Sequence, residues 1–277
     1  MNIDRVIFNF NSLCPNKCGF CYTPFDNKGT GNLVLWEKII NRINTFSPKL
    51  LSFAGGDPFA NLDFYSLITN LEKKCAINID TCGLFLDKTK FSRICNKIDV
   101  IGIPIDDADN MEHRQRYTLN QCKKVLSNLE CIRNYTENIT IHTLLTSINQ
   151  DYLVNIAQAL MSNKIKTWNI YQFWPFDFIK DKQKYFISDN VFTKIGANIN
   201  SLFGNMIDLK FKLYSQRKTG YFFVTSLGNV YTINPNNILE YVFIGSIFDS
   251  DICEKWSSIC DLTNYTERLD NKISREF

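Results

Sequence analysis

Long hydrophobic runs are missing from this chain of 277 residues, in which no window approaches about 18 consecutive apolar residues, the length that spans a membrane. The first residues, Met1-Asn2-Ile3-Asp4-Arg5, also lack the charged region, apolar run and cleavage site of a signal peptide. These absences exclude an ordinary transmembrane helix, and we expect a cytoplasmic protein with no membrane partner.

An excess of charge of one sign is also missing. The chain has 31 lysines and arginines against 28 aspartates and glutamates, and its net charge is +3. Its basic residues are scattered, with short groups such as Lys180, Lys182 and Lys184. Proteins that bind nucleic acids concentrate basic side chains on one surface. We therefore expect solvated helix faces and no nucleic-acid partner.

Linkers rich in Pro, Gly or Ser, internal repeats and low-complexity tracts are absent as well. Because 45% of the residues are hydrophobic, the chain is able to bury a full core. A phosphate-binding Gly-x-x-x-x-Gly-Lys loop is not present either. These features predict one globular unit of enzyme size.

Short apolar segments alternate with segments of helical periodicity. The expected strands cover 5–10, 49–54, 76–80, 98–105, 138–144 and 166–173. The expected helices begin near Val34 and cover about 61–74, 87–97, 118–134, 150–163 and 189–203, with Asn61, Asp87 and Ser188 as N-caps. Six strand-helix units in series predict an α/β fold with a parallel sheet, either open and doubly wound or an incomplete barrel.

The pattern changes after residue 205. Residues 221–225 and 230–233 read as two strands, and Leu227-Gly228-Asn229 between them supplies a tight turn. We expect a β-hairpin extension that covers one end of the sheet, followed by a helix that contains Cys253 and Cys260.

Three of the ten cysteines lie within eight residues, Cys14-Pro15-Asn16-Lys17-Cys18-Gly19-Phe20-Cys21, directly after the first strand. In parallel α/β folds, ligands bind at the carboxyl ends of the strands, which places this loop at the functional edge. A structural zinc site and an iron-sulfur cubane each normally take four protein ligands. Three thiolates would leave one iron of a cubane open. A zinc-stabilised module and an iron-sulfur electron carrier remain as alternatives. The other seven cysteines are isolated and read as core residues.

The spacing Cys14-x-x-x-Cys18-x-x-Cys21, with Phe20 before the last cysteine, resembles the signature of the radical S-adenosylmethionine (radical SAM) superfamily. The resemblance implies a partial (β/α)6 TIM-like barrel in residues 1–205, and a C-terminal extension in 206–277 over the barrel and substrate site. It implies an oxygen-sensitive [4Fe-4S] cluster on the three cysteines and S-adenosylmethionine as cofactors. A flavodoxin or ferredoxin-like donor would supply the electron, and the product would be a 5'-deoxyadenosyl radical.

Other segments extend the resemblance. Gly55-Gly56-Asp57-Pro58 is similar to the family's Gly-Gly-Glu-Pro segment, which binds the methionine amine, although Asp57 is one methylene shorter than Glu. A contact through backbone carbonyls would survive that change, whereas a direct carboxylate contact would have to span one methylene more. Thr81-Cys82-Gly83-Leu84 is similar to the family's Thr-Asn-Gly-Leu segment near the active site, which makes Thr81 a cofactor-binding candidate.

The fourth and fifth expected strands carry further cofactor-binding candidates. Pro104 stands where many relatives have a ribose-binding serine, which leaves Asp106 as the candidate ribose ligand. Arg116 or Arg114 is the candidate for the methionine carboxylate. On the fifth strand, alternation puts His142 and Leu144 on one face together with Thr146, and we expect at least one of these to touch adenosine or substrate.

Tyr171, Gln172 and Trp174 lie at the end of the sixth expected strand, where substrate would enter. This region resembles that of short, single-cluster members, including viperin-like nucleotide dehydratases and MoaA-like enzymes. Cys253 and Cys260 alone cannot hold a second cubane. The sequence therefore predicts a radical SAM enzyme that abstracts hydrogen from a small-molecule or nucleotide substrate, in specialised metabolism. The alternative is a single-cluster modifier of a ribosomally made peptide.

Overall fold

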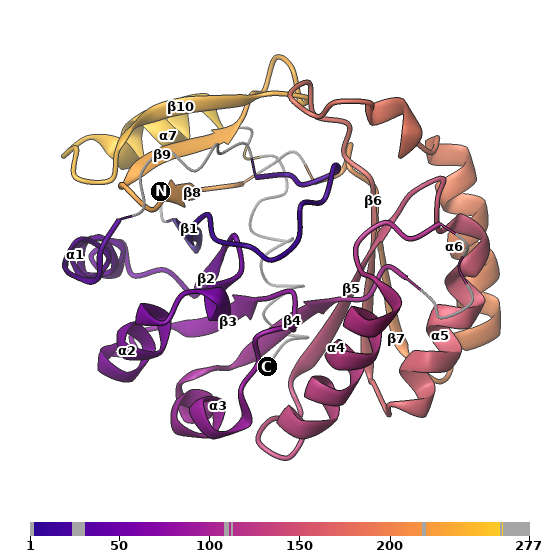
Figure 1. Cartoon of the computed structure of the whole chain (residues 1–277). Helices are drawn as coiled ribbons and strands as arrows, with labels where there is room; N and C mark the ends of the chain where they lie inside the picture. The colour runs from indigo at the N-terminus through magenta and orange to yellow at the C-terminus, as the bar shows by residue number, and fades with distance from the viewer. Residues whose placement is uncertain are drawn as a thin grey trace.

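A computed structural model describes residues 3–23, 31–107, 111, 113–217, 220–260 and 262 of the chain. Its centre is one ten-stranded sheet in the order β10-β9-β8-β1-β2-β3-β4-β5-β6-β7. The sheet curves around an interior, and helices cover its outer side (Figure 1). The α/β fold with a curved parallel sheet, predicted as a partial TIM-like barrel, is confirmed.

All six predicted strand-helix units are present. The strands are β1 (Arg5–Asn11), β2 (Leu50–Gly55), β3 (Ala76–Asp80), β4 (Val100–Pro104), β5 (Ile139–Leu145), β6 (Thr167–Gln172), β7 (Asp208–Lys212), β8 (Phe223–Thr225), β9 (Asn229–Ile233) and β10 (Tyr241–Ser246). The α-helices are α1 (Leu33–Asn44), α2 (Asp63–Asn70), α3 (Lys88–Ile94), α4 (Leu119–Ile132), α5 (Leu153–Ser162), α6 (Asp189–Phe203) and α7 (Ile252–Ile259). Short 3-10 helices cover Pro58–Ala60, Cys95–Lys97, Gln150–Tyr152 and Lys182–Lys184.

Two of the three predicted helix caps are present. Asp87 and Ser188 accept hydrogen bonds from the backbone amides of Lys90 and Val191 at the starts of α3 and α6. The third is confirmed in part: the N-cap position of α2 is Leu62, which makes no side-chain bond, but the Asn61 side chain accepts from the amide of Asp63, the first residue of α2, at 3.0 Å. In the described part of the chain, no helix is both long and apolar enough to cross a membrane.

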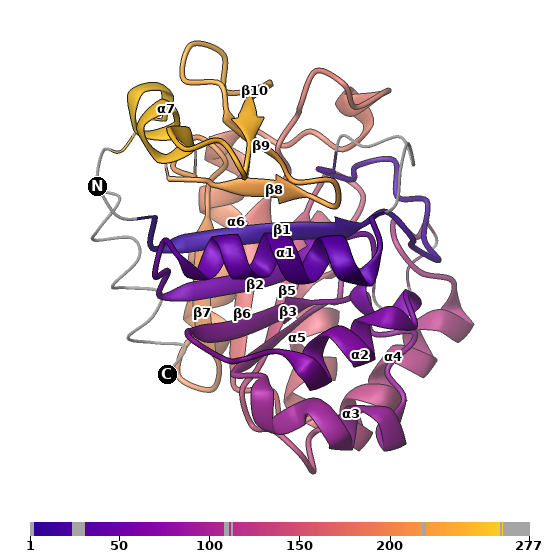
Figure 2. The ribbon, with the colours of Figure 1, turned by 90° about the vertical axis from the view of Figure 1, so that its left-hand side faces the viewer.

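The predicted hairpin is present as β8 and β9, and its first strand has a second partner. β8 pairs in parallel with β1, with Phe8 opposite Val224, while β8 and β9 are antiparallel. The C-terminal segment therefore extends the sheet beyond β1, and α7 lies beside β9 and β10 (Figures 1 and 2).

Two strands were not expected from the sequence. β7 pairs in parallel with β6, so the parallel sheet continues past residue 205. β10 pairs antiparallel with β9 and forms the other edge of the sheet. The two short strands are partly exposed along their length and lack the buried apolar run that marks an inner strand. Residues 263–277 of the predicted extension lie outside the described residues.

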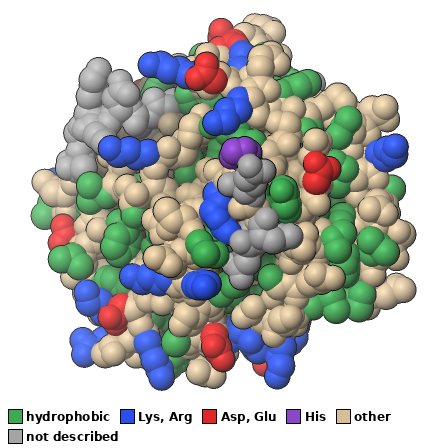
Figure 3. All heavy atoms as spheres, turned by 45° about the vertical axis from the view of Figure 1, so that its right-hand side comes forward, with side chains coloured by type: hydrophobic (Ala, Val, Ile, Leu, Met, Phe, Trp, Pro, Cys, Tyr) green, Lys and Arg blue, Asp and Glu red, His purple; other side chains and the backbone are tan. Residues whose placement is uncertain are grey.

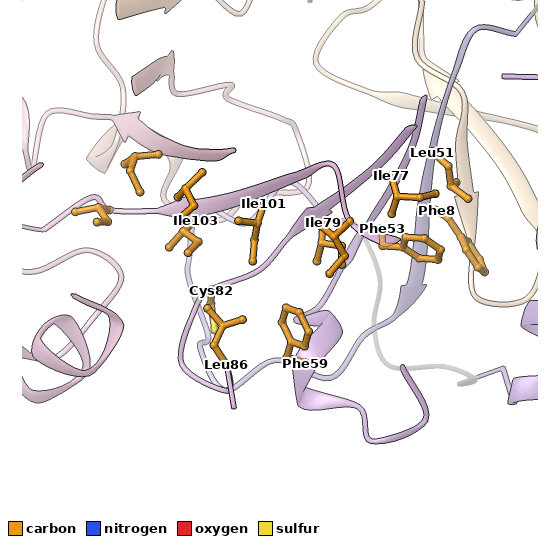
Figure 4. Close-up of a cluster of buried hydrophobic side chains, with 14 of the residues drawn as sticks. Phe8, Leu51, Phe53, Phe59, Ile77, Ile79, Cys82, Leu86, Ile101 and Ile103 are labelled. Carbon is orange, nitrogen blue, oxygen red and sulfur yellow. The ribbon is translucent and has the colours of Figure 1, made fainter. Parts of the chain in front are cut away.

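The outward-facing strand residues form the core under the helices. Phe8, Phe53, Ile79 and Ile101 come from four neighbouring strands and are fully buried, as Figure 4 shows. Because strand side chains alternate between faces, the residues between these point to the interior of the barrel. Many of these inward positions are polar, which sets the interior apart from the apolar outer core.

Candidate active site

The three clustered cysteines lie in the loop that leaves β1. Cys14 and Cys21 are exposed and Cys18 is half-buried, and the amide of Cys21 donates to the carbonyl of Cys18 at 3.1 Å. The loop stands at the carboxyl ends of the parallel strands, as predicted. Among the described residues, no three His, Cys, Asp or Glu side chains form a set that could hold a single metal ion. Three cysteines that ligate three different irons of a cubane do not converge on one point.

Arg116 reaches this loop from the segment that precedes α4. Its guanidinium donates from Nη1 to the Cys18 sulfur at 3.8 Å and lies 5.0 Å from the centre of the Phe20 ring. Its Nε atom binds the Asp106 carboxylate. The structure thus brings Arg116, Phe20 and Asp106 together around Cys18. Arg114 instead donates to the Cys122 sulfur at 3.3 Å, so Arg116 is the arginine at the site.

Asp106 is fully buried, and both of its carboxylate oxygens are occupied. One accepts from Arg116 and the other from the amide of Leu144 at 2.6 Å. Burial raises the pKa of Asp106, while Arg116 opposes that rise. The ribose contact that the sequence predicts for Asp106 stays a prediction, since each carboxylate oxygen can accept a second hydrogen bond. In this structure Asp106 orients Arg116.

The backbone that carries Arg116 is fixed by the neighbouring aspartate. The Asp107 carboxylate accepts from the amides of Gln115 at 2.6 Å, Arg116 at 3.0 Å and Tyr117 at 2.9 Å. Three amides on one buried carboxylate hold the segment in one conformation. No sequence pattern marked Asp107, because a carboxylate that caps loop amides has no spacing rule.

The Gly55-Gly56 segment ends β2 and is joined to the cysteine loop by backbone bonds. The amide of Gly56 donates to Asn11 at 2.7 Å, and that of Asp57 donates to Leu13 at 2.6 Å. A Cβ on Gly56 would lie 2.2 Å from the Leu13 carbonyl oxygen, so only glycine allows this approach. The cysteine loop is therefore positioned by the Gly-Gly-Asp-Pro segment.

The Asp57 carboxylate points away from solvent and is 0% exposed. It accepts from the Thr81 hydroxyl at 2.8 Å, from the Phe59 amide at 2.9 Å and from the amide and thiol of Cys82. Burial raises the pKa of Asp57 despite these bonds. The carboxylate and Thr81 thus tie the ends of β2 and β3 together. The sequence left two contacts open for the methionine amine, through backbone carbonyls of this segment or through the Asp57 carboxylate. Because the carboxylate is buried and bonded, the contact through backbone carbonyls fits this arrangement.

Cys82, which stands where the family pattern has Asn, is close enough to Cys14 to act on its ionisation and lowers the pKa of Cys14 to about 7. Burial raises the pKa of Cys18 to about 11. The neighbouring Cys14 and burial together raise the pKa of Cys82. Cys82 is therefore a buried neighbour of the loop, and Cys14 is the thiol that ionises more readily.

His142 on β5 lies on the inner face between Asp80 and Tyr171. Its Nδ1 atom is 3.8 Å from an oxygen of Asp80, and its ring meets the Tyr171 ring edge-on at 5.4 Å. The Asp80 contact crosses β4 at Gly102, where a Cβ would lie 2.3 Å from the Asp80 oxygen and 2.8 Å from His142 Cε1. Glycine at 102 is thus a requirement of the pair, which the sequence did not reveal.

Of the other two inner-face candidates on β5, Leu144 is half-buried and packs against the buried cluster to which Phe20 and Phe173 belong. Thr146 is buried, and its hydroxyl donates to the side chain of Gln115. Leu144 therefore keeps a surface toward the interior, and Thr146 does not.

The three predicted substrate residues do not share one environment. Tyr171 is half-buried on the inner face. Gln172 is 0% exposed, and its amide bonds to Ile187, Asp189 and the Tyr214 amide, so its side chain supports the fold. Trp174 is 7% exposed and donates to the Ile238 carbonyl at 2.7 Å.

Two cations that the sequence did not reveal accompany the predicted substrate residues. The Nζ atom of Lys212 lies 5.0 Å from the Tyr171 ring centre, and the Arg217 guanidinium lies 5.0 Å from Tyr171 and 5.1 Å from Trp174. They belong to β7 and the segment after it, which were not predicted to be part of the sheet. Elsewhere, charged side chains are scattered over the face in Figure 3.

The family model of the radical SAM superfamily matches residues 8–160, more than half of the chain. The chain belongs to the radical SAM superfamily. It is a radical SAM enzyme, and the cofactors of this family are a [4Fe-4S] cluster and S-adenosylmethionine. No curated protein matches the chain in sequence.

Solved structures of radical SAM enzymes share the fold at low sequence identity. The enzyme anSMEcpe with bound AdoMet is 18% identical, with a TM-score of 0.70 over 91% of this chain and 79% of that one. Streptococcus suis SuiB bound to the precursor peptide SuiA is 12% identical, with a TM-score of 0.71 over 91% of this chain and 64% of SuiB. This chain thus spans less than two thirds of SuiB. At such identity, the likeness shows the fold alone.

The residues at the site fit an iron-sulfur cluster in their chemistry. Two exposed thiols and one half-buried thiol occupy a single loop, and a guanidinium contacts one of the sulfurs. Cluster binding takes thiolates, and positive charge nearby stabilises negatively charged sulfur ligands. The donor set therefore suits the cofactor that the family implies.

Proposed function

We propose that Cys14, Cys18 and Cys21 hold the [4Fe-4S] cluster at which S-adenosylmethionine is reductively cleaved. The observation that carries this proposal is the meeting of the three-cysteine loop with Arg116 at the carboxyl ends of the strands. When bound, the cluster supplies the electron that converts S-adenosylmethionine into methionine and a 5'-deoxyadenosyl radical. A flavodoxin or ferredoxin-like protein is the proposed electron donor.

The chain's own residues would bind and orient S-adenosylmethionine in the following way. Backbone carbonyls of Gly55-Gly56-Asp57-Pro58 meet the methionine amine, because the Asp57 side chain is turned inward and the amides of Gly56 and Asp57 already donate to Asn11 and Leu13. Arg116, oriented by Asp106, binds the methionine carboxylate. Thr81 fixes Asp57 from the neighbouring strand.

The adenosine end of the cofactor lies toward β5 in this proposal. Leu144 and His142 present an apolar and a polar surface on the inner face, and Leu144 packs against the buried cluster to which Phe20 belongs. The substrate enters near Tyr171 and Trp174, at the ends of β6. The described part of the C-terminal extension, residues 206–217 and 220–260, encloses this side of the barrel in this proposal, since Tyr214 and Tyr221 pack against Trp174.

The proposed reaction is hydrogen abstraction from a small-molecule or nucleotide substrate in specialised metabolism. The retained alternative is a ribosomally made peptide. One observation favours it, because the similar folds include SuiB bound to the peptide SuiA and anSMEcpe bound to the peptide Cp18Cys. At 12% and 19% identity, that likeness concerns the fold and leaves the substrate to experiment.

The test is anaerobic reconstitution of the full chain with iron and sulfide, followed by dithionite and S-adenosylmethionine. Formation of 5'-deoxyadenosine, measured by chromatography, supports the proposal. An iron-sulfur electron carrier would give no nucleoside product, and a zinc module would contain zinc and lack absorbance near 400 nm. Deuterated nucleotides, and then peptides encoded beside the gene, are added next, and deuterium in 5'-deoxyadenosine identifies the substrate class.

A further inference from the structure

A group of two cations and two aromatic rings stands where β6 and β7 end. It consists of Tyr171, Trp174, Lys212 and Arg217, and we call it the cation-aromatic rim. Both cations lie over the Tyr171 ring, at 5.0 Å from its centre, and Arg217 also covers Trp174. The rim is thus one connected cluster and not a chance pair of surface charges.

The rim faces the interior of the barrel at its carboxyl edge. On β7, Leu209 and Phe211 pack into the outer core, where Phe211 meets Phe192 of α6. Lys212 is therefore on the inner face. The register pairs Lys212 with Tyr171 and Tyr171 with Leu144. The two cations consequently belong to the same end of the sheet as the cofactor-binding candidates.

Hydrogen bonds hold both cations in place. Lys212 donates from Nζ to the Tyr171 hydroxyl at 3.4 Å, and Arg217 donates from Nη2 to the Gln172 carbonyl at 2.8 Å. The Gln172 side chain accepts from the Tyr214 amide at 3.1 Å, which fixes the segment between the two cations. Cations held in this way lose little side-chain freedom when an anion binds.

Several other inner-face side chains present oxygen atoms. Asp80 presents a carboxylate beside His142. Buried oxygens of Asn9, Ser52 and Asn169 have no hydrogen-bond partner within the described residues. Asn9, Ser52 and Asn169 are 0 to 2% exposed, and their unpartnered oxygens can accept hydrogen bonds from donor groups of a ligand. A ligand in the barrel would place its anionic group at the rim and its donor groups against this part of the interior.

We propose that Lys212 and Arg217 bind an oxyanion group of the substrate. This inference rests on the proposed function and narrows its substrate class to molecules that carry a phosphate or a carboxylate. The guanidinium of Arg217 matches oxyanions in geometry, while Lys212 supplies a compact positive charge on the other side of Tyr171. Tyr171 and Trp174 provide a flat apolar surface next to the bound anion.

The test is calorimetric titration of the reconstituted full chain with tripolyphosphate and, separately, with citrate. Binding of either probe that weakens about tenfold or more in Lys212→Gln and in Arg217→Gln supports the inference. Preference for one probe tells a phosphate-bearing from a carboxylate-bearing substrate. Lys212→Arg keeps the charge and should keep most of the affinity.

Lys210→Gln is the matched control, because Lys210 lies two residues away on the same face and pairs with Asp208 at 3.5 Å. Equal loss in this variant, or no binding of either probe by the wild type, overturns the inference. Cleavage of S-adenosylmethionine is measured on the same wild-type preparation. If cleavage occurs without probe binding, the inference fails and the proposed function stands. If the probe binds but S-adenosylmethionine is not cleaved, the anion site stands and the proposed function fails.

Discussion

Asp106 binds Arg116, and Arg116 in turn contacts the sulfur of Cys18 at 3.8 Å. The carboxylate is 0% exposed and is also bonded to the Leu144 amide, so it holds the guanidinium from a fixed point on the sheet. A half-buried positive charge and its buried counter-charge thus lie beside one of the three cysteines that are proposed to hold the cluster. The positive charge of Arg116 should favour reduction of a cluster held there, and the negative charge of Asp106 should oppose it.

The first prediction concerns this pair. Reduction adds negative charge to the cluster, so Arg116→Gln is expected to lower the midpoint potential and Asp106→Asn to raise it. We expect each change to alter the reduction equilibrium about tenfold, which is about 59 mV for one electron. Redox titration followed by electron paramagnetic resonance measures both. Arg116→Lys is the control, and shifts of the same sign in the two variants would rule out an electrostatic effect.

The second prediction concerns the cysteines. Changing Cys14, Cys18 or Cys21 to Ala should abolish formation of 5'-deoxyadenosine, since each is expected to ligate a different iron. Cys253 and Cys260 lie on and next to α7, and Cys260 is buried beside Thr232. Their replacement should leave iron at about one cubane per chain. A loss of about four further irons would reveal a second cluster in the C-terminal region.

The third prediction is a pH dependence that comes from Asp57. Because burial raises its folded-state pKa above the usual 3.8, the folded protein favours the protonated carboxyl. This contribution to the free energy of unfolding is fully present below pH 3.8 and is lost as the pH rises through the raised pKa. Asp57→Asn removes the titration, so its stability relative to the wild type should rise with pH.

Urea unfolding of the reduced wild type and Asp57→Asn between about pH 4 and 8 measures that difference. Each tenfold difference in proton affinity between the folded and unfolded carboxyl corresponds to about 1.4 kcal/mol of unfolding free energy. Asp99, a partly exposed carboxylate that pairs with Lys73, serves as the comparison through Asp99→Asn. A stability difference for Asp57→Asn that stays constant, or falls with pH, would contradict the assignment.

The fourth prediction tests the contact across β4. A Cβ at position 102 would overlap Asp80 and His142, so Gly102→Ala should lower the free energy of unfolding by about 1 to 3 kcal/mol. The Asp80 oxygen would lie closer to the new methyl group than the His142 ring does, and Asp80→Ala removes that oxygen. In the double variant, the cost of Gly102→Ala should therefore shrink. If the cost is the same in both backgrounds, the destabilisation has another cause.

The outer core and the cysteine loop were predictable because both follow local rules. Phe8, Phe53 and Ile79 belong to short apolar runs, and such runs read as buried strands in any α/β chain. The strand β7 was not predicted, because its lysines interrupt the apolar run that marks a buried strand. The side chains of these lysines instead line the interior of the barrel. The burial of Gln172 was also unforeseen, since a polar side chain after a strand looks the same whether it faces ligand or fold.

The sequence by itself determined the α/β class, the strand-helix order and the three thiols after β1, because these depend on periodicity and on residue spacing. Only the tertiary structure decided what surrounds those thiols. Arg116 is 98 residues from Cys18 in sequence. Lys212 meets Tyr171 only because β7 lies beside β6. Such contacts arise from sheet register and crossover geometry, and no local pattern in the chain carries that information.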